Sequence, residues 1–370
     1  MKANLCLVRV VVSWAFWTGG MSADAYWLKV LSDDFSNSAS AWTYSGVSNA
    51  LNEPLFACDS GQQKIRAEWN QSNFYVGVAD PYTIIPSVIS RPLDRILTDN
   101  VTLRFGATLN ITTGSVVDTS EIFQIVNIAL CDVTLMGPDR PMSDNWSANT
   151  TLLRDGSDFL EFNYFVNNSW GGPNITAVMG AHITGVDGEY TTGIDYLQTA
   201  MGEGHWLPEG TNLYIQMEYF GAETGAMARV AHCAIYTEPS RTNVLIVNSV
   251  PMSYWTQSLP AEKYFRLTHL AFYNYPSANW GGANGTGAGT FDDVYVEQLV
   301  KSGDIFSNVQ QGGQIVTTWA AESGTTYYVE YSTNLVANTW VTNAVVEASG
   351  MTITYTNSIG GPGGCYRVTY

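Results

Sequence analysis

Positive charge is scarce in this chain. Its 370 residues include 16 lysines and arginines against 33 aspartates and glutamates, which gives a formal net charge of −17. A nucleic-acid partner requires a basic surface that meets the phosphates, and no basic run follows Arg9. We therefore expect no nucleic-acid partner. An acidic surface suits a secreted protein and is compatible with divalent cations.

The sequence also lacks the short motifs that mark many metal and catalytic sites. It contains no CxxC, HxH, HExxH or G-x-S-x-G, and its histidines are isolated. Structural zinc is therefore not expected. The glycine-rich stretch WGGANGTGAGT at 280–290 lacks the Lys-Ser/Thr of a phosphate-binding loop, so we interpret it as a flexible loop.

Long apolar runs are missing after residue 25, so we expect no membrane span. The first 25 residues resemble a signal peptide: Lys2 and Arg9 flank a basic region, 10–17 is apolar, and ADA at 23–25 is a small-x-small cleavage site. We predict that 1–25 is removed and that the mature chain is secreted, extracellular or at the cell surface. A membrane anchor is the alternative, which the shortness of the run disfavours.

Cysteine is sparse in the predicted mature chain. Four cysteines remain after the predicted cleavage, at 58, 131, 233 and 365. Four cysteines allow three disulfide connectivities, and the sequence does not choose among them. Cys131 and Cys233 lie in apolar, strand-like runs, where buried free thiols are as well accommodated as disulfides. Both alternatives stay open.

Helical periodicity is confined to one short segment, SRPLDRIL at 90–97, which we predict to be a helix. The rest alternates between β-branched or aromatic runs and clusters of Gly, Asn, Asp, Ser and Pro, the pattern of an all-β sandwich or jelly roll. The predicted strands of the larger part are KIRAEW, NFYVGVA, NVTLRFGATL, IFQIVNIAL, FLEFNYFV, NLYIQMEYF, ARVAHCAIY, NVLIVNSV, YFRLTHLAFYNY and FDDVYVEQL.

A domain boundary is predicted near VKSGDIFSNVQQGGQ at 300–314. The segment 303–370 then has its own strand candidates and a predicted core of Trp319, Tyr328, Val329, Trp340, Tyr355 and Tyr366. WAAESGTTYYVEYSTNL at 319–335, a following Trp and a closing YRV resemble a C-terminal module of secreted bacterial proteins. The resemblance implies a small fibronectin-III-like or immunoglobulin-like β-sandwich without chemistry of its own.

The larger part, 28–302, opens with LSDDFS and closes with GTFDDVYVE. These two motifs resemble the edges of concanavalin-A-like lectin and glucanase domains, of the LamG type, found in secreted bacterial proteins; laminarinase-type family-16 glycoside hydrolases share both motifs. The resemblance implies an antiparallel jelly roll whose first and last strands are adjacent. It also implies a structural calcium held by Asp34 and Asp292.

Strand alternation gives an independent reason to examine Asp292. It places Asp292 on the same face as Val294 and Val296, which we predict to be the core face. A carboxylate there requires compensation, either by calcium or by backbone N–H groups of the adjoining turn. By the same alternation, Asp33 and Asp293 are predicted to face solvent.

No catalytic residue emerges from the sequence. Family-16 glycoside hydrolases of the resembled class carry E-x-D-x-x-E on one strand, where two carboxylates flank the glycosidic bond; that spacing is absent. The nearest strand acids are Glu161 (with Asp158) and Glu218 (with Glu223). Acids from different strands could still converge, so a polysaccharide-cleaving enzyme stays an alternative.

Alginate-lyase-like jelly rolls are a second enzymatic comparison. YFRLTHLAFYNY resembles their tyrosine-rich strand through Tyr264, Arg266, His269 and Tyr273, but Asn127 stands near where their histidine would be, and no R-x-E-x-R strand is present. Without its partners, such a motif is weak support for an enzyme.

Loop tryptophans are the remaining functional signal. Exposed indole rings provide flat apolar platforms for sugars, and we predict this role for Trp146, Trp170, Trp206 and Trp280. The leading hypothesis is non-catalytic binding of a polysaccharide or glycan. A structural or adhesive surface protein that assembles with copies of itself is the alternative.

Overall fold

The computed structural model describes residues 25–36, 41–46, 48, 51–59, 61–69, 87–98, 101–116, 123–132, 159–167, 174–182, 190–194, 207–221, 230–251, 266–273, 285–301, 305–311, 314–332, 340–358 and 365–369. Within these ranges the extended regular elements are all β-strands. Among the described residues, no helix has the length and hydropathy needed to cross a membrane.

One sheet of the larger unit has eight strands. Its order is β13 (Val244–Pro251), β12 (Val230–Tyr236), β11 (Asn212–Phe220), β6 (Leu103–Val116), β15 (Gly285–Lys301), β4 (Lys64–Glu68) and β3 (Phe56–Asp59), and β1 (Ala25–Asp33) also pairs with β15. The expected adjacency of the opening and closing strands is therefore confirmed.

The second sheet has seven strands. Its order is β10 (Tyr190–Ile194), β9 (Asn174–His182), β8 (Phe159–Asn167), β7 (Phe123–Cys131), β14 (Leu267–Tyr273), β5 (Val88–Leu97) and β2 (Thr43–Ser45). The predicted helix at 90–97 is wrong, because this segment lies within β5. Pro92 is exposed at an irregularity of the β5–β14 pairing, a position at which a strand tolerates the missing N–H.

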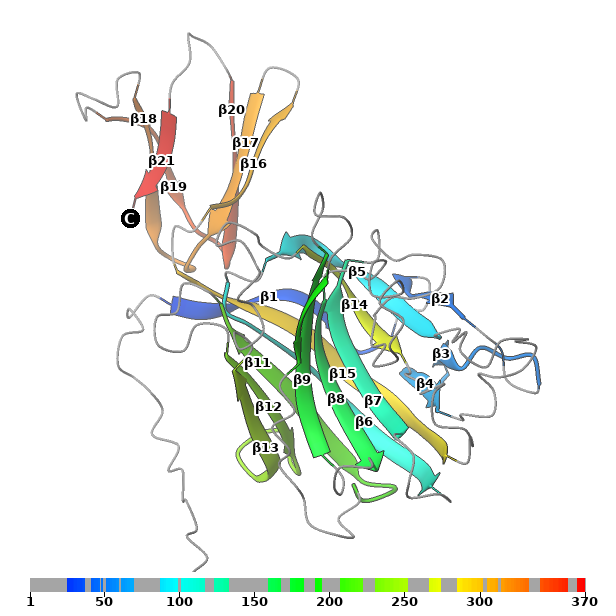
Figure 1. Cartoon of the computed structure of the whole chain (residues 1–370). Coiled ribbons are helices and arrows are strands. Elements are labelled where there is room, and N and C mark those ends of the chain that lie inside the picture. Colours follow the sequence, from blue (N-terminus) through cyan, green and yellow to red (C-terminus); the bar gives the residue numbers. More distant parts are fainter. Residues whose placement is uncertain are drawn as a thin grey trace, which may run out of the picture. The chain divides into compact units, whose positions relative to one another are not determined.

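The core lies between these two sheets, which form two layers (Figure 1). Strand alternation explains it: Leu103 and Phe105 of β6 and Leu160 and Phe162 of β8 point inward and belong to one buried cluster. The predicted all-β jelly-roll sandwich is thus confirmed.

The chain divides into two compact units, one of Lys29–Gln298 and one that combines Leu299–Tyr370 with the stretch ending at Leu28. The division falls inside β1 and inside β15, so each of these strands contributes residues to both units. In the smaller unit, the Tyr26 hydroxyl contacts the carbonyl oxygens of Ala321 and Met351 at 2.9 and 3.1 Å.

The smaller unit contains two three-stranded sheets. They are β16 (Ile305–Gln311), β17 (Gln314–Ala320) and β20 (Thr352–Ser358), and β19 (Val341–Glu347), β18 (Thr326–Ser332) and β21 (Cys365–Thr369). Side chains of both sheets share one buried cluster that includes Trp319, Tyr327, Val329 and Ile353, so this unit is a small β-sandwich. β16 occupies part of the segment predicted as a linker.

The predicted core of the smaller unit needs one correction. Trp319 and Val329 are buried as predicted, but Tyr328 is 42% exposed and Tyr327 is buried instead. Alternation requires this result, since Tyr327 and Val329 share a face that Tyr328 cannot share. β19 lies at a sheet edge, and its Val341 and Val345 are more than half exposed, at 68% and 59%.

Candidate functional site

The closing strand does not place Asp292 on the core face. β15 has a bulge between Asp292 and Tyr295 in its pairing with β6, and Asp293 adopts a φ of 47°. The extra residue lets both Phe291 and Val294 point into the core, which leaves Asp292 partly buried and Asp293 exposed. The prediction for Asp292 is therefore wrong, and that for Asp293 is confirmed.

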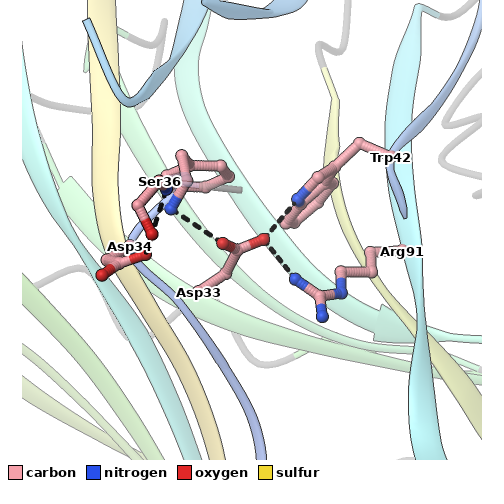
Figure 2. Close-up of polar contacts among 6 residues, drawn as sticks. Asp33, Asp34, Ser36, Trp42 and Arg91 are labelled. Atoms are coloured by element: carbon pink, nitrogen blue, oxygen red, sulfur yellow. Dashed lines mark hydrogen bonds and ion pairs between the residues drawn. The ribbon is translucent and has the colours of Figure 1, made fainter. Parts of the chain in front are cut away.

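Of the aspartates in the opening and closing motifs, the buried one is Asp33 of the opening motif. Asp33 is 5% exposed, contrary to the prediction that it faces solvent. Its Oδ1 accepts a hydrogen bond from the Phe35 backbone N–H at 2.7 Å, and its Oδ2 accepts one from the Trp42 indole at 2.8 Å and pairs with Arg91 of β5. Figure 2 shows the Asp33 carboxylate directed at Trp42 and Arg91. This charge network joins the opening strand to the seven-stranded sheet.

Aromatic packing surrounds this network. The Trp42 ring lies between Phe35 and Phe272, with centroid distances of 5.6 and 5.7 Å, and Phe272 contacts Phe291 of the other sheet at 4.4 Å. Phe35 has a φ of 56°, which is uncommon for a residue with a side chain. The tight turn brings the Phe35 N–H back to Asp33.

The predicted calcium ligands lie near each other, but the described residues do not complete a calcium site. Asp34 is exposed, and its Oδ1 accepts hydrogen bonds from the backbone and hydroxyl of Ser36, which lower its pKa. Burial, followed by the charges of Asp293 and Asp34, raises the pKa of Asp292. Calcium takes about six to eight oxygen ligands, and no group of three or more potential ligand side chains occurs in the described part of the chain.

The four tryptophans predicted as sugar platforms, Trp146, Trp170, Trp206 and Trp280, lie outside the described residues. Their places in the chain are still informative, since each follows a strand of the seven-stranded sheet: β7, β8, β10 and β14. Because successive strands of this sheet are antiparallel, β8, β10 and β14 run in the same direction, and their C-terminal ends lie at the same end of the sheet. In the sequence, Trp170, Trp206 and Trp280 come after these three strands.

The outer face of this sheet carries an unusual row of polar side chains. Asn127 of β7 and Asn163 of β8 are directly opposite in the register. Both face away from the core, because their neighbours Ile128 and Phe162 point into it. Phe272 pairs with Ile128, so the next residue of β14, Tyr273, lies beside Asn127. We call Tyr273, Asn127 and Asn163 the Tyr-Asn-Asn row.

These side chains are shielded from water and have no hydrogen-bond partner in the part of the chain that the structure describes. Asn127 and Asn163 are 0% exposed and Tyr273 is 2% exposed. Both amide groups, nitrogen and oxygen, and the Tyr273 hydroxyl lack partners. An unsatisfied buried polar group costs about 1–3 kcal/mol, so a fold that keeps three such residues together calls for an explanation. A ligand rich in hydroxyl groups would supply the missing bonds.

The neighbouring positions on this face are small or acidic. Glu161 of β8 is opposite Ala129, which is opposite Ala271 of β14. Glu161 is 5% exposed, and its charge, together with that of Asp132, adds to burial in raising the pKa of the Cys131 thiol. Both alanines are fully buried and belong, with Phe159 and Tyr273, to a second buried cluster on this face.

The histidine of β14 lies on the same face, two alternation steps from Tyr273. His269 Nδ1 is 2.8 Å from the Thr268 hydroxyl, which is itself 3.2 Å from Asp132 Oδ1. Burial lowers the pKa of His269, and the Asp132 charge opposes that shift, so the imidazole is neutral at pH 7. The structure thus brings His269 and Tyr273 to one face, whereas Tyr264 lies outside the described residues and Arg266 is exposed.

The two strand acids considered for catalysis do not converge. Glu218 lies on β11, in the other sheet, opposite Arg104, and Arg104 also pairs with Glu297 at 2.5 Å. Burial raises the pKa of Glu218, and Arg104 opposes the rise. Glu161 and Glu218 face outward from opposite sides of the sandwich, with the core between them. They cannot flank one glycosidic bond; Asp158 and Glu223 lie outside the described residues.

Three cysteines of the described part of the chain carry no disulfide. Cys58, Cys131 and Cys233 are free thiols, and burial raises the pKa of each, to about 11 for Cys58. Cys131 and Cys233 are fully buried, in keeping with the free-thiol alternative for these two residues.

Comparison with known proteins yields similarities of fold at very low sequence identity. No family model and no curated protein matches the chain. Similar solved structures include the Emp47p carbohydrate recognition domain (9% identity, TM-score 0.37, covering 76% of this chain and 99% of that one). Lectin II from Ulex europaeus is 8% identical (TM-score 0.35; 75% and 99% covered). The endo-β-1,3-glucanase from Pyrococcus furiosus is 10% identical (TM-score 0.34; 75% and 96% covered). At these values no ligand or activity transfers to this chain.

Proposed function

We propose that this chain is a secreted glycan-binding protein whose binding site is the outer face of the seven-stranded sheet around the Tyr-Asn-Asn row. The observation that carries the proposal is the set of unpartnered, fully shielded amides of Asn127 and Asn163 beside the Tyr273 hydroxyl. Secretion rests on the sequence of residues 1–25 alone. No catalytic role is assigned to any residue.

Carbohydrate chemistry matches this row. A sugar hydroxyl both donates and accepts a hydrogen bond, and an asparagine side chain offers a donor and an acceptor on one planar group. Two opposed asparagines and a phenol can therefore meet several hydroxyls of one sugar at once. The predicted roles of Trp146, Trp170, Trp206 and Trp280 as apolar platforms for sugar rings are part of this proposal. A sugar must replace the atoms that now cover these side chains, so we expect association slower than diffusion.

Binding is tested by substitution of the row. On a glycan array, the mature protein is expected to retain at least one polysaccharide, and Asn127→Ala and Asn163→Ala are expected to weaken that binding about tenfold or more, the equivalent of about 1.4 kcal/mol. Both variants should keep or raise the melting temperature, because they remove polar groups that have no partner in the fold.

A matched control is available on the opposite sheet. Asn110 of β6 donates to Asn212 at 2.8 Å, so Asn110→Ala should leave glycan affinity unchanged. Retention of no glycan by the wild-type protein, or unchanged affinity in both row variants, would overturn the proposal.

Structural calcium at Asp34 and Asp292 is the second part of the proposal. Support comes from the charges of Asp34 and Asp293, which help raise the pKa of Asp292; a cation would relieve that repulsion. Ionised Asp292 therefore destabilises the folded state at neutral pH. This destabilisation disappears as the pH falls below the ordinary pKa of an aspartate.

Calorimetry with and without calcium tests this part. A bound ion stabilises the folded state by about 2.7 kcal/mol when its concentration is about one hundred times Kd. In chelator, Asp292→Asn should melt at or above the wild-type temperature, and calcium should stabilise the wild type but not Asp292→Asn. Asp94→Asn, an exposed acid of β5, should respond to calcium as the wild type does. If neither chelator nor calcium changes the melting temperature of the wild type, the calcium part of the proposal is wrong.

A further inference from the structure

A serine and a histidine contact each other on the outer face of the eight-stranded sheet. Ser249 of β13 is directly opposite His232 of β12 in the register. Both side chains face away from the core, because Ala231, Cys233 and Ile246 belong to the buried cluster between the sheets. The Ser249 hydroxyl oxygen lies 2.7 Å from His232 Nδ1. This pair and the Tyr-Asn-Asn row lie on different sheets, and glycan binding by the row does not use the pair.

His232 has the properties of a base at neutral pH. Burial lowers its pKa, so the imidazole is neutral at pH 7 and one of its nitrogens is an acceptor. The tautomer with its proton on Nε2 lets Nδ1 accept the hydrogen bond of the Ser249 hydroxyl. The Phe220 ring packs against the imidazole edge-on, at 85° and with ring centroids 5.2 Å apart. This contact holds the plane of the imidazole while Nδ1 faces the serine.

The serine of this pair is accessible from solvent. Ser249 is exposed, and β13 is at the edge of its sheet in the order of the described strands. Val247, two positions earlier on β13, is on the same face as Ser249, and Phe220 contacts the imidazole. These apolar neighbours favour a substrate whose acyl group is uncharged.

We infer that Ser249 and His232 form a nucleophile–base pair that hydrolyses esters of short, uncharged carboxylic acids, an activity beyond glycan binding. The Ser249 Oγ attacks the carbonyl carbon of the ester while its proton passes to His232 Nδ1. The C–O bond to the alcohol then breaks, and the leaving alcohol takes that proton. Water next attacks the acyl-serine and gives one proton to His232. The carboxylic acid leaves, and His232 returns the proton to the Ser249 Oγ.

Labelling of the full chain with a fluorophosphonate tests the pair. A serine that is activated by a base displaces fluoride from phosphorus and retains the phosphonyl group, and peptide mass spectrometry locates the modified residue. We expect the label on Ser249 of the wild type and at no site in Ser249→Ala. In His232→Gln the labelling rate should fall by at least about a hundredfold, the usual contribution of a general base. Acetyl transfer from p-nitrophenyl acetate to Ser249 should follow the same order.

Ser240→Ala is the matched control. Ser240 is also exposed, and its hydroxyl lies 3.1 Å from that of Thr242, so this variant should be labelled at the wild-type rate. Absence of the label from Ser249 of the wild type overturns the inference, as does an unchanged labelling rate in His232→Gln. Equal labelling of heat-denatured wild type overturns it too, because the serine would then react without the folded pair. None of these results bears on glycan binding, which is measured separately.

Discussion

Replacement of Arg91 by alanine is expected to destabilise the larger unit by about 3–5 kcal/mol, because it leaves a buried carboxylate without its compensating charge. Asp33 is 5% exposed, and the Arg91 side chain that pairs with it is 22% exposed. Chemical denaturation, followed through the unfolding transition of the larger unit, measures the loss. The double variant Asp33→Asn/Arg91→Gln should recover part of it, since both charges are then absent.

An exposed ion pair in the same unit provides the control. Arg66 and Glu53 lie 3.4 Å apart with side chains 39% and 49% exposed, and such pairs contribute about 0–1 kcal/mol. Arg66→Ala should therefore have a small effect. Equal losses in Arg91→Ala and Arg66→Ala would show that the Asp33 network is no stronger than a surface pair.

The variant Gly106→Ala is expected to cost at least about 3 kcal/mol, at the upper end of overpacking effects. A Cβ atom at Gly106 would lie 2.0 Å from the Ile215 carbonyl oxygen and 2.9 Å from the Tyr295 hydroxyl. Gly106 lies on β6 between β11 and β15, so the backbone atoms around it have little room to shift. The Tyr295 hydroxyl, which donates to Gln216 at 2.8 Å, would also be displaced.

Gly350→Ala is the matched control. Nothing lies within 4 Å of a Cβ atom at that position, so the change should stay within about 0.5 kcal/mol. Thermal melting of both variants distinguishes them. A Gly106→Ala protein that melts with the wild type would mean that the sheet accommodates a methyl group where the described backbone leaves no space.

The hydrophobic periodicity of the sequence was sufficient to predict the two sheets of the fold. It was not sufficient to predict which face of a strand each residue occupies. Alternating apolar runs predict the strands of both sheets. The adjacency of the two ends of the larger part came from the family resemblance that the DDF and FDDV motifs carry. Simple alternation could not predict which residues of β15 face the core, because the bulge at Asp293 changes the side that Asp292 faces. For the same reason, the sequence predicted a buried Asp292 and an exposed Asp33, whereas Asp33 is the more buried of the two. Aspartate tolerates a positive φ better than most residues, so adjacent aspartates inside a strand were a usable signal of a bulge.

The candidate site was harder to predict than the fold. Asn127 and Asn163 each interrupt a strongly apolar strand, FQIVNIALC and FLEFNYFVN, and this interruption is visible in the sequence. That the two amides face each other depends on the register between β7 and β8, which no local pattern determines. The tryptophan platforms remain predictions. The topology adds only that Trp170, Trp206 and Trp280 follow, in the sequence, strands that end at the same end of the sheet.

The open edge at β19 has a practical consequence. A sheet edge presents unpaired backbone groups, and valines exposed along it favour pairing with a strand from another molecule. Val341 and Val345 carry no charge that would oppose such pairing, although Glu347 ends the strand. The edge of the smaller unit at β19 is therefore one place at which molecules can adhere in concentrated solution. A lysine at Val345 is the first substitution to make when a homogeneous sample is required.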